Sequence, residues 1–270
     1  MDWPNRTLVM GILNVTPDSF SGDGLGTDVG AALRQAREMV EAGADVLDVG
    51  GESTAYWKAG YQPVTDEEEL RRVLPVVARL RAELPATPIS IDTRKPAVAR
   101  AALAAGAAWL NDVEGVWDDG SMADLAAEFG ATFVIMYNAR ERTGRNIVDE
   151  VRDALEAAAA RALERGVPQD QIVVDPGFGF GNVPGHEAEL VRGLPKIVAL
   201  GYPVLVGPSR KRFIGRVLGT AEGDRVEGTA AVVALAVAAG VAAVRVHDVR
   251  PISRVLRMTD ALVRAQPAPA

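Results

Sequence analysis

The sequence contains no cysteine, few aromatic residues and no run of basic residues. Aromatic side chains make up 5% of the 270 residues, and the formal net charge is −7 at pH 7. Without cysteine there are no disulfide bonds, and the usual thiolate ligands of structural zinc are missing. Nucleic-acid binding requires clustered Lys and Arg, so we expect no nucleic-acid partner. The composition is compatible with the reducing cytoplasm, where we expect the protein to lie.

The sequence also lacks a recognisable targeting or membrane-spanning segment. The start, MDWPNRTLVM, has no basic stretch followed by an apolar one, so we expect no signal peptide. The apolar segment at residues 229–244 is shorter than the roughly 20 residues of a membrane helix and is interrupted by Gly240. We interpret it as a buried helix that ends at Gly240 and is followed by a strand. A helix that is apolar on all sides must be covered on all sides, which points to a subunit interface and a homodimer.

Short runs rich in Val, Ile and Leu recur along the chain, and such runs are typical of strands buried on both faces. Eight are present: TLVMGILNV, DVLDVG, PISID, AWLND, TFVIMY, QIVVD, PVLVG and AAVRVHD. Helical patterns lie between them, of which residues 65–84 and 148–165 are the clearest. Thr65 and Glu68 form a capping box at the first of these helices, and Pro75 is expected to bend it or to mark its start.

Alternation of strand and helix predicts the fold. Eight βα units in a chain of this length are typical of the (β/α)8 barrel, a fold of the α/β class. We expect residues 1–270 to form a single domain, with a short disordered tail from about residue 266. The alternative is an open doubly wound sheet. Neither NVTPDSFSGDG after the first run nor GFGFG at 177–181 has the G-x-G-x-x-G spacing that such a sheet usually carries.

In such a barrel the functional groups lie at the C-terminal ends of the strands, and every predicted strand here ends in polar residues. In chain order they are Asn14; Glu52, Ser53 and Thr54; Asp92; Asn111 and Asp112; Tyr137 and Asn138; Asp175; Ser209, Arg210 and Lys211; and Arg245, His247 and Asp248. A polar residue marks the exit of many strands without any function. All eight strand ends together favour a site at this rim.

The predicted rim residues fall into two chemical groups. Acceptors and an amide, which suit a flat, nitrogen-rich heterocycle with several N–H donors, come from Asp92, Asn111 and Asp175. Donors, which suit an anion such as a diphosphate, come from Asn14, Lys211, Arg245 and His247. His186, expected at an exposed helix start, and His247 lack the spacing of a metal site. Magnesium held by one amide oxygen and substrate phosphates is compatible with this rim.

Seven motifs at the strand ends closely resemble those of the dihydropteroate synthase family, in the same order, from about residue 8 to residue 250. They are MGILNVTPDSFS, DVGGEST, SIDTRKP, LNDVEG, DPGFGFG, PVLVGPSRKRFIG and VRVHDV. The resemblance implies a (β/α)8 barrel that uses magnesium. It also implies an activity that joins 4-aminobenzoate to the methylene group of a dihydropterin diphosphate, releasing diphosphate, in folate synthesis.

Carried over by motif, the resemblance implies a role for individual residues. The pterin-binding residues are then Asp92, Asn111, Val113, Met136, Asp175, Gly207 and Lys211. The diphosphate is bound by Asn14, Arg245 and His247, with magnesium on Asn14. The 4-aminobenzoate lies beside Thr54, Phe180 and Arg212. Catalysis is then carried by Asp92, Asp175, Lys211, Arg245 and His247.

The sequence departs from the family pattern in two loops. Where the family reads Phe-Ser-Asp-Gly-Gly, this chain has FSGDG, which displaces Asp23 by one position. Where the family reads Ser-Thr-Arg-Pro-Gly, this chain has STAYW, so the arginine is missing. Our hypothesis is that Tyr56 or Trp57 stacks near the aminobenzoate ring while Lys58 serves its carboxylate or the diphosphate.

Two other functions remain open at this point. One is a folate-dependent methyltransferase on a related pterin-binding barrel, against which the SRK and VRVHDV motifs argue, because a methyl donor brings no diphosphate to bind. The other is a diverged family member that binds a pterin without turnover, supported by the missing arginine and the displaced Asp23.

Overall fold

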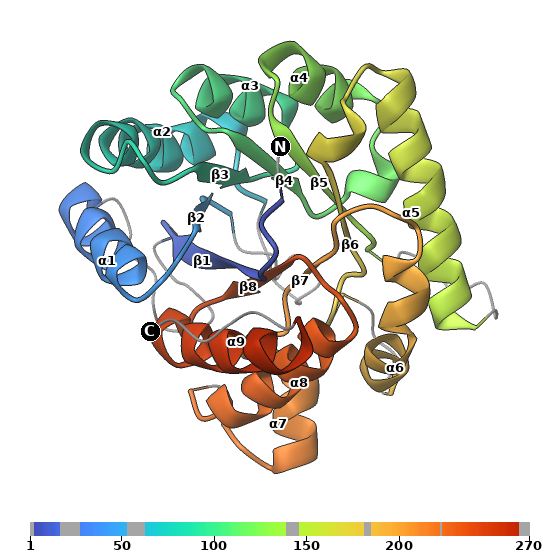
Figure 1. The fold of residues 1–270 in the computed structure, drawn as a ribbon. Helices are drawn as coiled ribbons and strands as arrows, with labels where there is room; N and C mark the ends of the chain where they lie inside the picture. Colours follow the sequence, from blue (N-terminus) through green and yellow to red (C-terminus); the bar gives the residue numbers. More distant parts are fainter. Residues whose placement is uncertain are drawn as a thin grey trace.

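Eight parallel strands form one sheet that curls into a nearly closed barrel with helices around it (Figure 1). The computed structural model describes residues 3–16, 28–52, 63–138, 146–180, 185–221 and 223–264. The strands are β1 Leu8–Asn14, β2 Val46–Gly50, β3 Ile89–Asp92, β4 Trp109–Asp112, β5 Thr132–Met136, β6 Ile172–Asp175, β7 Leu205–Val206 and β8 Ala243–Val246. The predicted residues that lie outside the described ranges are Asp23, Ser53, Thr54, Tyr56, Trp57, Lys58 and the tail from 266.

The strand order confirms the predicted barrel and excludes the open doubly wound sheet. Neighbours run β6-β5-β4-β3-β2-β1-β8-β7, so the first strand pairs with both the second and the last. The two ends of this order meet at a bridge between Val174 and Val204, and the backbone N–H of Val174 donates to Pro203 O at 2.9 Å. β7 is shorter than the predicted run PVLVG, because only Leu205 and Val206 pair along its length.

Helices follow the strands as the sequence pattern predicts. Those described are α1 Val29–Glu41, α2 Asp66–Glu83, α3 Pro96–Ala104, α4 Ser121–Phe129, α5 Ile147–Glu164, α6 His186–Val198, α7 Arg212–Leu218, α8 Val226–Ala238 and α9 Val249–Val263. The Thr65 hydroxyl accepts from the Glu68 backbone N–H at 3.2 Å, which confirms that half of the predicted capping box. Pro75 lies inside α2 and therefore does not mark the start of the helix. None of the described helices is long and apolar enough to cross a bilayer.

The barrel interior is apolar at the N-terminal ends of the strands. Alternate residues face inward, and those that pack together there are Leu8, Met10, Val46, Trp109, Val134, Val173, Leu205 and Ala243. Trp3 covers this layer with its ring edge-on to Trp109, at 5.8 Å between centroids, and its indole N–H donates to Asp170 O at 3.1 Å. Toward the C-terminal ends of the strands, the inward-facing positions include the polar residues Asn14, Asp92 and Asn111.

One buried carboxylate joins the last helix to the residue that precedes β1. Asp260 on α9 accepts from both the backbone N–H and the hydroxyl of Thr7 at 2.9 Å, and from Arg264 Nε at 2.7 Å. Thr7 immediately precedes β1, so this cluster ties the two ends of the chain together. Removal of the carboxylate takes the hydrogen-bond acceptor from the Thr7 donors and the counter-ion from Arg264, in a place with little access to water.

Asp260→Ala is therefore expected to lower the free energy of unfolding by about 3 kcal/mol, measured by urea denaturation. Glu128→Ala is the control, since it removes an exposed ion pair with Arg100 and is expected to leave the urea midpoint unchanged. Equal midpoints for the Asp260 variant and the wild type would contradict this role.

Candidate active site

Three of the predicted rim residues stand in one row across neighbouring strands. Asn14 is paired in register with Gly50, Gly50 with Asp92, and Asp92 with Asn111. Residues paired in this way point to the same face of a sheet, which here is the barrel interior. A Cβ atom at Gly50 would lie 3.6 Å from Asp92 Oδ2 and 3.8 Å from Asn14 Oδ1. The glycine therefore leaves open the space between the carboxamide and the carboxylate.

Arg245 joins this row from β8, the strand that pairs with β1. Its Nε donates to Asp48 Oδ2 at 2.5 Å and its Nη2 to Asp92 Oδ2 at 2.6 Å. Asn111 Nδ2 donates to the same Asp48 oxygen at 3.1 Å. Although burial lowers it, the charges of Asp48 and Asp92 raise the pKa of the Arg245 guanidinium above its ordinary value. The two chemical groups predicted from the sequence are thus joined by direct ion pairs.

Asp48 is the member of this cluster that the sequence analysis missed. It lies in the middle of β2 rather than at its end, and its exposed fraction is 0%. A strand-end search cannot find such a residue. The available signal was an acidic residue inside the otherwise apolar run VLDVG, because a charge buried in a strand requires a partner.

Two carboxylates and one amine at this end of the barrel have shifted pKa values. Burial raises the pKa of Asp92 to about 7, although the Arg245 charge acts in the opposite direction. Burial raises the pKa of Asp175 to about 6, opposed by the Gly177 N–H that donates to it at 2.8 Å. Burial lowers the pKa of Lys211 to about 8. These groups therefore exchange protons near neutral pH, as functional groups often do.

Lys211 reaches the site because the backbone before it turns sharply. Arg210 adopts φ +56°, an uncommon value for a residue with a side chain. The Lys211 ammonium then lies 4.0 Å from the centre of the Phe180 ring. Gly179 gives this side chain its space, because a Cβ there would lie 2.8 Å from Lys211 Cδ. The predicted pterin and aminobenzoate residues Lys211 and Phe180 are thus brought together.

Ser209 and His247 form a pair at the ends of β7 and β8. The His247 backbone N–H donates to Ser209 Oγ at 3.1 Å, and Oγ lies 3.0 Å from His247 Nδ1. The hydroxyl therefore contacts both the backbone and the ring of His247, and the hydrogen-bond direction at Nδ1 depends on the imidazole tautomer. These two contacts fix the position of the imidazole at the end of β8.

The remaining predicted binding residues surround these groups. Met136 is paired in register with Asp175, and Val113 follows β4 with little exposure. Gly207 follows β7, where a Cβ would lie 3.9 Å from that of Arg245. Arg212 begins α7 and is exposed, directly after Lys211.

Other polar residues at strand ends turn away from the site, so the prediction that all of them form one rim was too broad. Tyr137 donates from its hydroxyl to Glu150 on α5 at 2.5 Å. Arg210 binds Asp248 through Nε at 3.0 Å and Nη2 at 2.7 Å. Asp112 accepts from a backbone N–H two residues later at 2.9 Å, and burial raises its pKa to about 8. These bonds fix loops and helices around the barrel.

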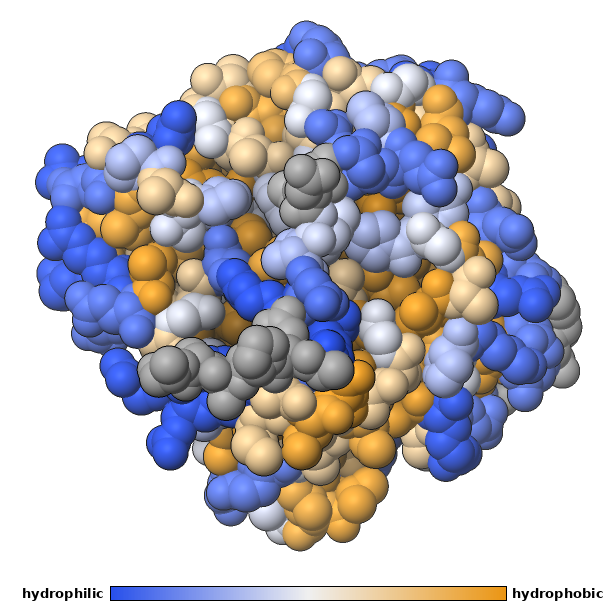
Figure 2. Space-filling model, in the orientation of Figure 1, coloured by the Kyte–Doolittle hydropathy of each residue, from blue (hydrophilic) through white to orange (hydrophobic). Residues whose placement is uncertain are grey.

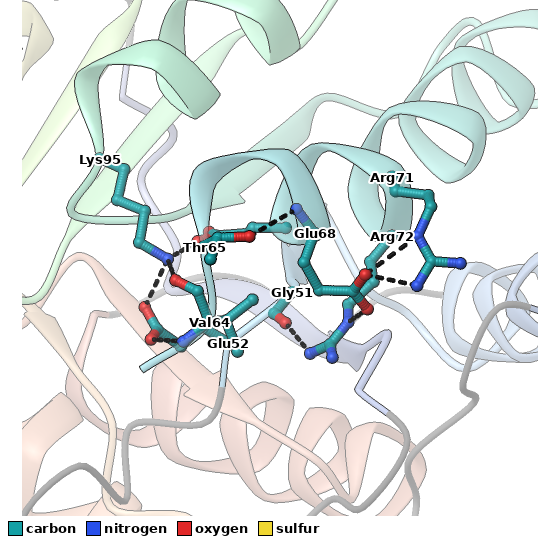
Figure 3. A network of polar contacts seen from close by, with 9 residues as sticks. Gly51, Glu52, Val64, Thr65, Glu68, Arg71, Arg72 and Lys95 are labelled. Carbon is teal, nitrogen blue, oxygen red and sulfur yellow. Dashed lines mark hydrogen bonds and ion pairs between the residues drawn. The ribbon is translucent and has the colours of Figure 1, made fainter. Parts of the chain in front are cut away.

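Glu52 belongs to a separate ion network beside β2, drawn in Figure 3. Lys95 Nζ lies 2.6 Å from Glu69 Oε2 and 3.1 Å from Glu52 Oε2, and donates to Val64 O at 2.5 Å. Glu52 in turn accepts from the Val64 backbone N–H at 3.1 Å. The network therefore holds together the two flanks of residues 53–62. It also explains why Glu69 on α2 has an exposed fraction of 0%.

The residues present are compatible with the magnesium ion expected from the sequence. The described residues contain no group of three or more His, Cys, Asp or Glu side chains that could hold a metal ion. Asn14 offers a carboxamide oxygen at the end of β1, in the row that includes Asp92. A single neutral oxygen suits an ion that keeps most of its waters and takes its other ligands from phosphate groups.

The fold and this site define a class: a (β/α)8-barrel enzyme with a buried charged cluster at the C-terminal ends of its strands. The family model described as pterin binding enzyme matches residues 10–247. Dihydropteroate synthase of Bacillus subtilis is 43% identical over 263 residues, which cover 97% of this chain and 91% of that protein.

Two solved structures agree with this sequence relationship. Dihydropteroate synthase from Clostridium difficile in the presence of pteroic acid has a TM-score of 0.90 at 43% identity, covering 98% of this chain and 99% of that one. Dihydropteroate synthase from Thermus thermophilus in complex with 4-aminobenzoate has a TM-score of 0.82 at 45% identity, covering 95% of each chain. The chain belongs to the pterin-binding enzymes and, within them, to the dihydropteroate synthases, which are transferases of folate biosynthesis.

The raised pKa of Asp92 can be measured directly by titration. In the ligand-free protein, the Asp92 side-chain carbon is expected to titrate near pH 7 in carbon NMR spectra, assigned by its loss in Asp92→Asn. In Arg245→Gln the same signal is expected to titrate at a higher pH, because the guanidinium favours the charged carboxylate. Titration of Asp92 near the ordinary value of about 4 would contradict the burial that raises it.

Proposed function

We propose that this chain condenses 6-hydroxymethyl-7,8-dihydropterin diphosphate with 4-aminobenzoate, giving 7,8-dihydropteroate and diphosphate. The observation that carries the proposal is the cluster in which Arg245 links Asp92 to Asp48 and, through it, to Asn111. It places acceptors for a nitrogen heterocycle beside a fixed cation for an anionic leaving group. Membership of the dihydropteroate synthases supports the same substrates.

The pterin ring would lie over the inner row of the barrel. The Asp92 and Asp175 carboxylates are suited to accept N–H bonds from the ring, and the Asn111 carboxamide oxygen is suited to accept another. Lys211 carries a positive charge beside them that can donate to a ring oxygen or nitrogen. Because the nearby carboxylates are ionised above their pKa values, they also favour positive charge that develops on the pterin during reaction.

The diphosphate would lie toward the donors on β1 and β8. Arg245 and the Nε2 nitrogen of His247 are suited to bind its oxygens, and Asn14 would hold magnesium through its carboxamide oxygen. When bound, magnesium supplies positive charge that neutralises the departing diphosphate. Ser209, which contacts the backbone N–H and Nδ1 of His247, fixes the position of the imidazole.

The 4-aminobenzoate would enter beside the Phe180 ring, with the exposed Arg212 at the start of α7 as a cation for its carboxylate. Thr54 is proposed to border it as well. Departure of the diphosphate is the step that needs help, because an aromatic amine is a weak nucleophile. Among the described residues, Ser209 is the hydroxyl beside an imidazole, but it is 5% exposed and engaged with His247. We therefore propose a dissociative substitution without a covalent enzyme intermediate.

A mixture of both substrates, magnesium and this protein is expected to yield 7,8-dihydropteroate and diphosphate in equal amounts, measured by liquid chromatography and mass spectrometry. Removal of magnesium with EDTA is expected to stop product formation reversibly. Lys211→Met is expected to lower kcat/KM by about a hundredfold or more, since it removes a buried charge from the site.

The outcomes of this assay separate the alternatives. Binding of the pterin diphosphate in calorimetry without any product would identify a non-catalytic pterin-binding protein. Transfer of a methyl group from a folate, with no diphosphate released, would identify a methyltransferase. A covalent pterin adduct on the intact protein would contradict the dissociative mechanism.

We also propose that the protein forms a homodimer through α7, α8 and α9. Apolar side chains gather over α7 and α8 at the lower edge of Figure 2. Large exposed residues on these three helices are Val217, Leu218, Leu235, Met258, Leu262 and Val263, with exposed fractions of 80%, 49%, 59%, 60%, 71% and 47%. Large contiguous apolar surface on a soluble chain usually marks an interface, and a second copy offers the same surface by symmetry.

Leu235→Lys is expected to convert the dimer to a monomer at low micromolar concentration, measured by sedimentation, because it places a charge in the middle of this surface. Leu163→Lys is the matched control on α5, where the leucine is 39% exposed, and it is expected to leave the mass unchanged. A monomeric wild type would overturn the proposed dimer.

A further inference from the structure

Asp48 is the least accessible member of the charged cluster. Register pairs it with Ser90 on β3, two residues below the row that contains Gly50 and Asp92. Its exposed fraction is 0%, against 9% for Asp92. A substrate at the C-terminal ends of the strands would meet Asp92 first, because Asp48 lies two residues deeper in the barrel and has no exposed surface. Any effect of Asp48 on the reaction must therefore act through other protein groups.

The bonds of Asp48 lead to two residues of the proposed site. One of its oxygens, Oδ2, accepts from Arg245 Nε at 2.5 Å and from Asn111 Nδ2 at 3.1 Å. Arg245 comes from β8 and Asn111 from β4, so Asp48 on β2 joins strands on either side of it. A carboxylate with two such donors on one oxygen fixes the orientation of both side chains.

Arg245 binds two carboxylates that differ in their exposure to the mouth of the barrel. Asp48 is enclosed within the barrel, whereas Asp92 stands at the end of β3, where the pterin would bind. The pterin N–H groups would compete with Arg245 for the oxygens of Asp92, but no substrate group has access to Asp48. With only Asp92 as a counter-ion, Arg245 would hold that carboxylate more strongly and make it a poorer acceptor for the pterin.

Given the proposed function, we infer that Asp48 is a positioning residue that retains Arg245 while Asp92 exchanges it for the pterin. In this arrangement Nε of Arg245 stays hydrogen-bonded to Asp48, and its Nη groups exchange Asp92 for the diphosphate. The same contact holds the Asn111 amide so that its oxygen faces the ring. Asp48 thereby couples the pterin-binding residues to the residue that binds the leaving group.

Asp48→Asn keeps the shape of the side chain and removes its charge. The dissociation constant for 6-hydroxymethyl-7,8-dihydropterin diphosphate with magnesium, measured by calorimetry, is expected to rise about 10- to 100-fold, and KM for that substrate is expected to rise with it. KM for 4-aminobenzoate is expected to stay unchanged, since its proposed residues do not contact Asp48. A role limited to stability would lower the urea midpoint and leave both constants as in the wild type, which would overturn the inference.

Ser90→Ala is the matched control. Ser90 is paired with Asp48 in register and has the same exposed fraction of 0%, and among the described residues its hydroxyl has no hydrogen-bond partner. The variant changes a buried polar group at the same depth without touching Arg245 or Asn111. Its substrate constants are expected to equal those of the wild type. A rise like that of Asp48→Asn would show that any change at this depth has the same effect, and would overturn the inference.

A second measurement does not depend on activity and remains available if Asp48→Asn folds poorly. Arg245→Met leaves the buried Asp48 charge without its cation, so it is expected to lower the urea midpoint strongly. Adding Asp48→Asn removes that charge, so the double variant is expected to have a higher midpoint than Arg245→Met alone. A double variant no more stable than Arg245→Met would overturn the pairing.

Nitrogen NMR of the wild type separates this inference from the proposed function. The Arg245 Nε–H signal, assigned by its loss in Arg245→Lys, is expected to be protected from exchange before and after addition of pterin diphosphate with magnesium. A protected signal that becomes exposed on binding would overturn the retention of Arg245 by Asp48. Absence of pterin binding in calorimetry would instead contradict the proposed function, while the stability comparison would still report on the pairing.

Discussion

The contact of the Arg245 guanidinium with Asp48 and Asp92 is the interaction on which the rest of the site depends. A cation in the barrel mouth needs counter-ions because desolvation of an unpaired charge costs several kcal/mol. Two carboxylates supply them, one enclosed in β2 and one at the end of β3. The same cluster fixes the Asn111 amide, and the charge of Arg245 opposes the burial that raises the pKa of Asp92. Its charges also lie where the substrates are expected to bind.

The barrel can hold such a cluster because its interior is divided by depth. Trp3 and Trp109 close a mainly apolar layer at the N-terminal ends of the strands. Water and substrates therefore approach from the C-terminal ends alone, which concentrates functional groups there. Outside the strands, separate polar contacts stabilise the structure. The Lys95 network holds the flanks of residues 53–62, and Asp260 joins α9 to the residue before β1.

Much of the fold could be predicted because each signal was local. Runs of β-branched residues marked all eight strands, and the Thr65 cap placed the start of α2 correctly. The short β7 was overestimated, because Pro203 and Gly207 continue the apolar pattern without continuing the pairing. In the site, strand ends located Asp92, Asn111 and Asp175, since position along a strand decides which residues reach the barrel mouth. The same rule included Tyr137, whose hydroxyl binds Glu150 instead.

The sequence by itself determined the class of the fold, the end of the barrel that carries the chemistry and the family to which the motifs point. Each of these depends on periodicity, on strand ends or on short motifs, which are properties of neighbouring residues. Only the tertiary structure decided that Asp48 pairs with Arg245 across 197 positions, and that Arg210 turns to Asp248 while Lys211 turns inward. Closure of the barrel brings β8 beside β1 and within reach of β2. Which buried charges then form ion pairs depends on this three-dimensional arrangement and cannot be predicted from neighbouring residues.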